Sequence, residues 1–401
     1  MMNGMKLYLE YISVGLLSLL VFLISISHEF IAPFIVLWII SIVGLLVIEK
    51  PIFHLNKGLV GLILFYVFLT IGMIWTDNKE AGAFDLEVKM SLILFPLLLL
   101  VKQYKFKFLK WIILAFFIGL IVSSFYNLTE AFLRYISGNS YDTFLYANLS
   151  SRIHPTYMSL YYATAIVILL IDIKYNRLIK KKWLSILLLS YFYCYNFLLL
   201  SKAGIIIVSL FLVVFLITWS INNRKIIFPL LTIIGLSGLF VLSYQKSELV
   251  QHRVDELIHG LASGEKSNGS TGIRLRIWTE GLSLIKERPL FGYGTGDVKD
   301  VLMERYDEVR MCTAYDNKLN AHNQFVQIAI SIGLFGLLLF LFVLFEAIRN
   351  GYKNNNFYIV SFVIIVIAYA LTESLLENQA GTIFFGLFFS LLNQKNFFIH
   401  D

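Results

Sequence analysis

The sequence is poor in charge, in cysteine and in metal-binding patterns. Only 15% of its 401 residues are charged, whereas 58% are hydrophobic, and a soluble domain averages roughly 25% charged residues. Because the apolar residues come in long blocks, we exclude a soluble multidomain protein and expect a chain that folds in lipid. Cys194 lies in an apolar run and Cys312 in a polar loop, so we expect no disulfide between them. No spacing of cysteine and histidine indicates a metal site.

The N-terminal region lacks the pattern of a cleavable signal peptide. Its first apolar block, 11–26, is followed by His28 and Glu29 and then at once by another apolar block. This arrangement predicts a hairpin of two membrane spans. The chain also lacks an internal repeat of the kind that marks many secondary transporters.

The apolar blocks predict about twelve transmembrane helices, with eleven as the nearest alternative. A span needs roughly 20 mostly apolar residues. The fourth predicted span contains Pro96 and is short, and the last two are marginal in length. On this scale the spans are 11–27, 30–48, 58–75, 88–101, 111–128, 155–171, 183–200, 204–221, 226–243, 323–346, 357–372 and 380–393.

The distribution of Lys and Arg predicts the orientation. With a cytoplasmic N-terminus, the short cytoplasmic segments hold 17 basic residues and the short outward loops hold 5. This asymmetry follows the positive-inside rule and places both termini in the cytoplasm. It also explains the net charge of +7, because basic loops face anionic lipid. We therefore expect membrane lipid, and no nucleic acid, as the partner of these charges.

One long outward loop, residues 244–321, interrupts the series of spans. Its acidic and basic side chains are nearly balanced, so it can fold as a small subdomain. Its pattern predicts helices at 248–261, 274–287 and 297–310, the first with Val250, Val254, Leu257, Ile258 and Leu261 on one face. We therefore expect an all-α polytopic membrane protein with a large, partly helical periplasmic loop between spans nine and ten. The predicted parts are 1–243, 244–321 and 322–401.

The strongest local signal is a polar cluster where this loop enters the tenth span. His322 stands at the entrance, and Asn323 and Gln327 share a helix face at i and i+4. A neutral imidazole there is suited to act as general base or hydrogen-bond partner for an acceptor hydroxyl. Helix capping and interfacial anchoring are the alternative, and spacing alone favours them.

Several basic residues lie on the same predicted side of the membrane. Arg274 and Arg276 precede Trp278 near a helix start, where a bound anion would offset their unfavourable position. Arg152 and His154 stand just before Pro155, a suitable first helical residue, and Lys202 lies in a short outward turn. These cations are suited to form a basin for a polyanionic headgroup, although helix-end solvation and snorkelling to the interface explain them as well.

Two further features have both a functional and a structural interpretation. The turn Gly292-Tyr293-Gly294-Thr295-Gly296 lacks the strand and the Lys-Ser/Thr continuation of a phosphate loop, so it more simply separates two helices. Glu373 and Glu377 lie i, i+4 in an outward turn, where carboxylates are candidates for function or for interfacial solvation.

Two motifs resemble a known family. His322-Asn323, nine residues and then Gly333-Leu334-Phe335-Gly336 is similar to the His-Asn-x9-Gly-x-x-Gly signature of O-antigen ligases. The stretch from Arg274 to Trp278, with Pro289 to Gly294, resembles the Arg-x3-Trp … Pro-Leu-x-Gly-x-Gly segment of the wider ligase and polymerase superfamily. The motifs cover roughly residues 150 to 336, and the predicted layout is similar over the whole chain.

The resemblance implies a metal-independent glycosyltransferase of the bacterial inner membrane, without a cofactor, whose active site faces the periplasm. The donor would be a glycan on undecaprenyl pyrophosphate, and the acceptor a sugar hydroxyl of lipid A–core. Arg274 matches the arginine that binds pyrophosphate, His322 the histidine that activates the acceptor, and Arg152 more loosely a second arginine. Lys202 departs from the family, in which an arginine is usual.

Other functions remain open on the sequence. A polysaccharide polymerase or a protein O-oligosaccharyltransferase of the same superfamily would share the donor chemistry and differ in the acceptor. A polysaccharide transporter, from a different class, would also have about twelve spans. The lack of a repeat and the scarcity of ionisable residues within the spans argue against transport.

Overall fold

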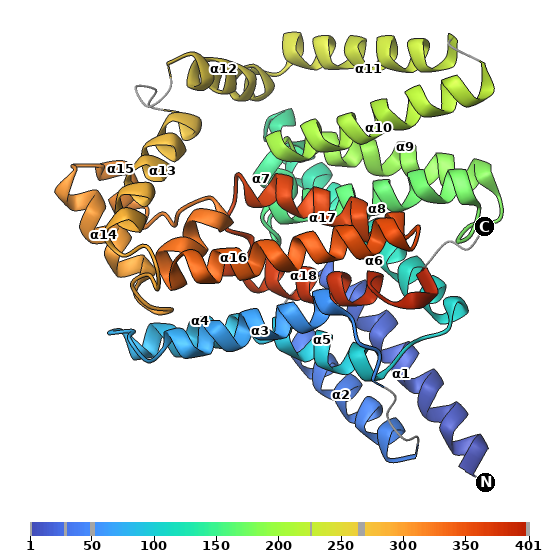
Figure 1. Ribbon diagram of the computed structural model, residues 1–401. Helices are drawn as coiled ribbons and strands as arrows, with labels where there is room; N and C mark the ends of the chain where they lie inside the picture. Colours follow the sequence, from blue (N-terminus) through green and yellow to red (C-terminus); the bar gives the residue numbers. More distant parts are fainter. Residues whose placement is uncertain (1, 28–29, 49–52, 225–226, 264–268, 398–401) are drawn as a thin grey trace. The chain divides into compact units, whose positions relative to one another are not determined.

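The computed structural model describes residues 2–27, 30–48, 53–224, 227–263 and 269–397, and its regular elements in these ranges are helices (Figure 1). The predicted all-α class is thus confirmed for the described residues. The α-helices are α1 (Met2–Ile24), α2 (Ile31–Ile48), α3 (Lys57–Gly72), α4 (Lys79–Lys89), α5 (Ser91–Val101), α6 (Phe106–Ile136), α7 (Tyr146–Leu149), α8 (Pro155–Tyr175), α9 (Lys182–Leu198), α10 (Lys202–Asn223), α11 (Ile227–Lys246), α12 (Glu248–Ser263), α13 (Ser270–Glu287), α14 (Val298–Glu308), α15 (Cys312–Asp316), α16 (Gln324–Lys353), α17 (Phe357–Ala370) and α18 (Gln379–Leu392).

Six of the described helices are long and apolar enough to cross a membrane: α1, α2, α6, α8, α10 and α16. Three shorter apolar helices are α3, α17 and α18. Each predicted span overlaps a helix, but the fourth, 88–101, consists of the end of α4 and the 11 residues of α5. At 1.5 Å per residue α5 is about 16 Å long, whereas the hydrocarbon core is about 30 Å thick. The count of twelve spans therefore stays a prediction.

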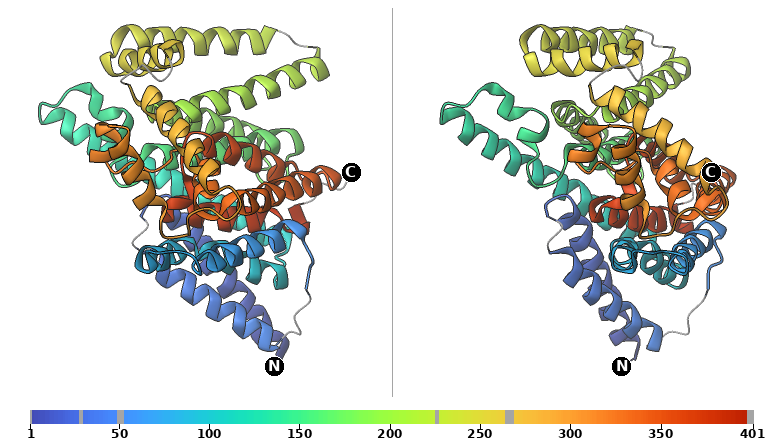
Figure 2. Two further views of the ribbon diagram at one scale, coloured as in Figure 1. Left: turned by 60° about the vertical axis from the view of Figure 1, so that its left-hand side comes forward. Right: turned by 90° about the vertical axis from the view of Figure 1, so that its left-hand side faces the viewer.

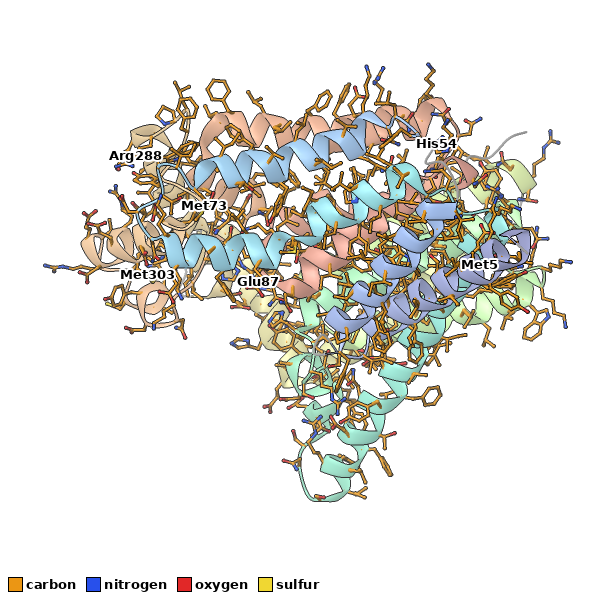
Figure 3. The ribbon with its side chains drawn as sticks, turned by 90° about the horizontal axis from the view of Figure 1, so that it is seen from below. Met5, His54, Met73, Glu87, Arg288 and Met303 are labelled. Atoms are coloured by element: carbon orange, nitrogen blue, oxygen red, sulfur yellow. The ribbon has the colours of Figure 1, made fainter. Side chains whose placement is uncertain are left out.

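The chain divides into two compact units. The first unit comprises Met1–Leu120 with Arg276–Asp401, and the second comprises Ile121–Leu275. In the first unit α1 packs on α2, α3 on α16, and α5 on α18 (Figures 1 and 2). Helix α3 runs from beside His54 to Met73, and Arg288 and Met303 lie at its Met73 end (Figure 3). That end of the unit carries the polar residues described below.

Helix α16 is broken near its middle. Ile332 and Gly333 have non-helical backbone angles, and Gly333 has φ 68° and ψ −170°. A Cβ atom at Gly333 would collide with the carbonyl of Leu290, so glycine is needed there for both its conformation and its size. The predicted span 323–346 overlaps α16, which is long and apolar enough to cross a membrane, and the helix is broken within that span.

The segment that follows α13 docks on the break. Its Gly292 has φ 69°, and a Cβ there would lie 2.5 Å from the Ile330 carbonyl oxygen. A helix break frees backbone groups that need new partners, and this segment supplies them. The hydrogen bonds run from Tyr293 N to Ile330 O (2.9 Å), from Gly294 N to Ser331 O (2.9 Å) and from Leu334 N to Pro289 O (2.8 Å). The glycine-rich turn thus separates two helices, as predicted, and also joins the two sequence motifs.

The second unit is built around α8, which packs against α9 and α10. Helix α8 starts at Pro155, as predicted. Asp172, near its end, accepts hydrogen bonds from the backbone N–H groups of Leu178 (2.6 Å) and Ile179 (3.1 Å). These bonds fix the turn that returns the chain into α9.

The helices predicted in the long loop are present with small shifts: α12, α13 and α14 cover most of 248–261, 274–287 and 297–310. Val250 is buried in a cluster with Leu145 and Leu200, and Val254 packs against that cluster. Ile258, assigned to the same face of α12, is exposed instead. The predicted apolar face of α12 is therefore exposed at Ile258.

Candidate active site

The segment before α16 holds His322 in a fixed position. The backbone of His322 is left-handed, with φ 44°, a conformation that is uncommon outside glycine and persists only where neighbours enforce it. Its N–H donates to the Asn320 side chain (2.9 Å). On the preceding residue, Trp278 Nε1 donates to the Ala321 carbonyl (3.1 Å), and the Ala321 N–H donates to Gln327 Oε1 (3.2 Å).

His322 faces a carboxylate. Its Nδ1 lies 3.2 Å from Oε1 of Glu373, which is only 8% exposed. A carboxylate accepts hydrogen bonds, so Nδ1 is the donor in this pair, and in a neutral imidazole Nε2 is then the acceptor. An imidazole oriented in this way is suited to accept a proton from a hydroxyl at Nε2 and to be stabilised by Glu373 once it is charged.

The turn that carries Glu373 is clamped by the first residues of α16. The Asn323 side chain caps α16 by accepting from Phe325 N (3.0 Å) and also donates to the Leu371 carbonyl (3.3 Å). Gln324 Oε1 accepts from Leu376 N (2.7 Å). Capping, which spacing favoured for Asn323, is thus confirmed, and the same residue helps to hold the carboxylate partner of His322.

A buried lysine, missed by the sequence reasoning, holds the other end of this turn. Lys89, 4% exposed, binds the carboxylates of Asp85 and of Glu377, the latter at 2.8 Å. Burial, assisted by the charge of Glu377, raises the pKa of Asp85 to about 6 against the opposing effect of Lys89. Lys89 lies at the start of the predicted fourth span, 88–101. Its ion pair with Glu377 could not be predicted, because Glu377 is distant in sequence.

The ionic cluster of Asp85, Lys89 and Glu377 adjoins the clamp on α16. These three residues line one small cavity together with Gln324 and Gln327. Asp85 Oδ2 and Gln324 Nε2 are buried there without a hydrogen-bond partner among the described residues. Polar side chains therefore continue from His322 and Glu373 into the interior of the first unit.

In the second unit, Lys202 is an ion-pair partner rather than an isolated cation. Its Nζ lies 3.0 Å from Glu256 Oε2 and 3.4 Å from Thr271 Oγ1. Glu256 Oε1 also accepts from the Ser270 N–H (2.6 Å), at the start of α13. Burial acts to raise the pKa of Glu256, but these bonds outweigh it and lower the pKa to about 2. Thr271, which Lys202 contacts, precedes Arg274 by three residues in α13.

Arg152 and His154 have local partners in the second unit. The Arg152 guanidinium lies 4.0 Å from the centre of the Tyr126 ring and donates to its hydroxyl (2.5 Å). His154 is the N-cap of α8 and accepts from Thr156 N (3.4 Å). Arg276 belongs to the first unit, and its Nε is buried there without a described partner.

A pocket of about 300 Å³ lies at the opposite end of α16 and is not part of this site. Its lining includes Lys57, Glu346, Arg349, Lys353 and Lys395. The pocket residues Glu346, Arg349 and Lys353 lie in the last turns of α16, after its break, whereas His322 precedes its first residue. The candidate residues thus form two groups, His322 with Glu373 in the first unit and Lys202 with Arg274 in the second.

Comparison with known proteins identifies the central part of the chain. Residues 187–341 match the family model described as O-antigen ligase. An uncharacterized protein of Haemophilus influenzae (strain Rd) is 27% identical over 176 residues, which cover 41% of this chain. The match spans 44% of that relative's length, so less than half of it is represented. The central part of the chain, residues 187–341, is thus similar to O-antigen ligases, and six of the described helices are long and apolar enough to cross a membrane.

Proposed function

We propose that the protein transfers a glycan from undecaprenyl pyrophosphate to a hydroxyl of lipid A–core at the periplasmic face of the bacterial inner membrane. The observation that carries the proposal is the pair of His322 and Glu373. His322 precedes α16 inside the segment that matches the ligase model, and Glu373 lies in the turn after α17. Both termini are then cytoplasmic, as the distribution of basic residues favours.

The reaction needs a base and a site for the leaving group. The acceptor oxygen attacks the anomeric carbon of the glycan, and its proton passes to Nε2 of His322. The bond from that carbon to the pyrophosphate oxygen breaks, and its electron pair leaves with undecaprenyl pyrophosphate. Glu373 stabilises the imidazolium. The reaction also needs cations that stabilise the negative charge on the pyrophosphate, a role that we assign to Arg274 and Lys202.

The proposed reaction needs no metal ion, since the lipid pyrophosphate is itself a good leaving group when cations neutralise it. We therefore expect purified protein to transfer glycan from a polyprenyl pyrophosphate donor in the presence of a chelator. Loss of transfer on chelation, with recovery on adding a divalent cation, would contradict this mechanism. Transport in liposomes without any transfer would favour the transporter instead.

Deletion of the gene separates the ligase from the polymerase. Without a ligase, lipopolysaccharide on a gel shows bare core while lipid-linked polymer accumulates. Without a polymerase, the gel shows core carrying a single repeat. An unchanged gel pattern would reject both activities for this chain and direct attention to protein acceptors.

A further inference from the structure

Helix α12 presents two charged residues to the turn before α10. Val250 anchors the helix by packing against Leu145 and Leu200. Arg253 and Glu256 follow at i+3 and i+6, and residues three apart on a helix lie on one face. Glu256 reaches Lys202, and Arg253 Nε donates to the Leu200 carbonyl (3.2 Å).

The guanidinium of Arg253 is held along one face and one edge. Its Cζ lies 3.8 Å from the centre of the Tyr146 ring, so the plane of the group is covered by an aromatic ring. Stacking and the bond to Leu200 immobilise the side chain, which lowers the entropy that a ligand must otherwise remove. Among the described residues, the two terminal nitrogens of Arg253 have no hydrogen-bond or ion-pair partner.

Around the turn before α10, Arg253 and Arg274 are better suited than Lys202 to bind an anion. The ammonium of Lys202 already pairs with Glu256 and is a point charge without a planar fork. Arg253 binds the carbonyl of Leu200, two residues before Lys202, and Arg274 follows Thr271, which Lys202 contacts, by three residues in α13. Two guanidinium groups therefore border a lysine that its own ion pair largely neutralises. Arg253 of α12 thus supplies the planar guanidinium group that Lys202 lacks.

We propose that Arg253 binds the phosphate oxygens of the lipid-linked pyrophosphate donor, beside Arg274, through its two terminal nitrogens. The inference rests on the proposed function, because it names a ligand group for that donor. A purely structural role, in which Arg253 only ties α12 to the turn before α10, is the competing interpretation. It predicts altered stability without a specific change in donor affinity.

The test uses the full-length purified protein and undecaprenyl pyrophosphate without acceptor. Arg253→Lys keeps the positive charge but removes the fork, so we expect donor affinity to fall about tenfold with little change in thermal stability. Arg134→Lys is the matched control, since Arg134 lies in the same unit and donates to the Asn148 carbonyl. Its donor affinity should equal that of the wild type.

The outcomes distinguish this inference from the proposed function. If the wild type binds the lipid pyrophosphate and Arg253→Lys binds it equally well, Arg253 is not a ligand and the inference is wrong, while the function stands. If the wild type neither binds the lipid nor transfers glycan, the proposed function is wrong, and the inference that rests on it is wrong as well. Restoration of donor affinity in the double variant Lys202→Arg/Arg253→Lys would support a fork at this place.

Discussion

Nδ1 of His322 lies 3.2 Å from Oε1 of Glu373, although 51 positions separate the two residues in sequence. The contact orients the ring so that Nε2 is left to act as a base. The contact also depends on two further residues, because Asn323 and Gln324 hold the turn that carries Glu373. The pair is therefore the part of the molecule on which activity should depend most directly.

We expect His322→Ala to lower the rate of glycan transfer about 10²- to 10⁴-fold, the usual contribution of a general base. Glu373→Gln should lower kcat by at least about tenfold, because glutamine cannot stabilise the imidazolium. Transfer from a lipid-linked donor by purified protein measures both effects. Glu80→Gln, an exposed carboxylate in the first turn of α4, is the control and should be unchanged. Wild-type kcat in both test variants would remove His322 from the mechanism.

The buried cluster around Lys89 should make stability depend on pH. The pKa of Asp85 is raised from 3.8 to about 6 in the folded protein, so between about pH 4 and 6 the folded state binds more protons than the unfolded state. Protonation of Asp85 therefore contributes to the free energy of unfolding. This contribution is fully present below about pH 4 and is lost as the pH rises through about 6. Asp85→Asn should therefore be more stable than the wild type above pH 6, by at most about 3 kcal/mol.

Thermal unfolding of the solubilised protein at pH 5 and at pH 7.5 measures this difference. The exposed Asp77, in the loop before α4, provides the control, and Asp77→Asn should not change the pH dependence. Equal shifts of Asp85→Asn at both pH values would mean that Asp85 does not titrate between pH 5 and pH 7.5 and would contradict this prediction.

Much of the fold could be predicted because it depends on local patterns. The apolar blocks indicate the helices, and Pro155 indicates the start of α8. The break in α16 could not be found in this way. Gly333 and Gly336 are visible in the sequence, but the break is stable only because Pro289, Tyr293 and Gly294 supply hydrogen bonds from a different segment.

The candidate site shows the same difference between local patterns and tertiary contacts. His322, Arg274 and Lys202 stand out as polar residues at the ends of apolar blocks, where sequence patterns are informative. The residues that surround them do not, because Lys89 meets Glu377 and Lys202 meets Glu256 through tertiary contacts. From the sequence alone, a lysine in a predicted interfacial turn is expected to be solvated, because its carboxylate partner is known only from the tertiary structure.

The broken turn of α16 makes a prediction about stability. Gly333→Ala should destabilise the protein by at least about 1–3 kcal/mol, because alanine disfavours the positive φ and its Cβ meets the Leu290 carbonyl. Gly15→Ala in α1 is the control, since nothing lies within 4 Å of a Cβ there. Thermal unfolding compares the two variants, and equal melting temperatures would contradict the described break.

Lys202 offers a test of the ion pair that neutralises it. Lys202→Arg keeps the pair with Glu256 and adds a fork, so transfer should be retained or mildly increased. Lys202→Met leaves the Glu256 carboxylate without its cation beside Arg253 and Arg274, and this carboxylate then competes with the donor for both guanidinium groups. We expect the KM for the donor to rise about tenfold in this variant. Lys180→Met, an exposed lysine of the α8–α9 turn, should leave KM unchanged. If Lys202→Met has the KM of the wild type, the cations of the second unit do not bind the donor through this cluster.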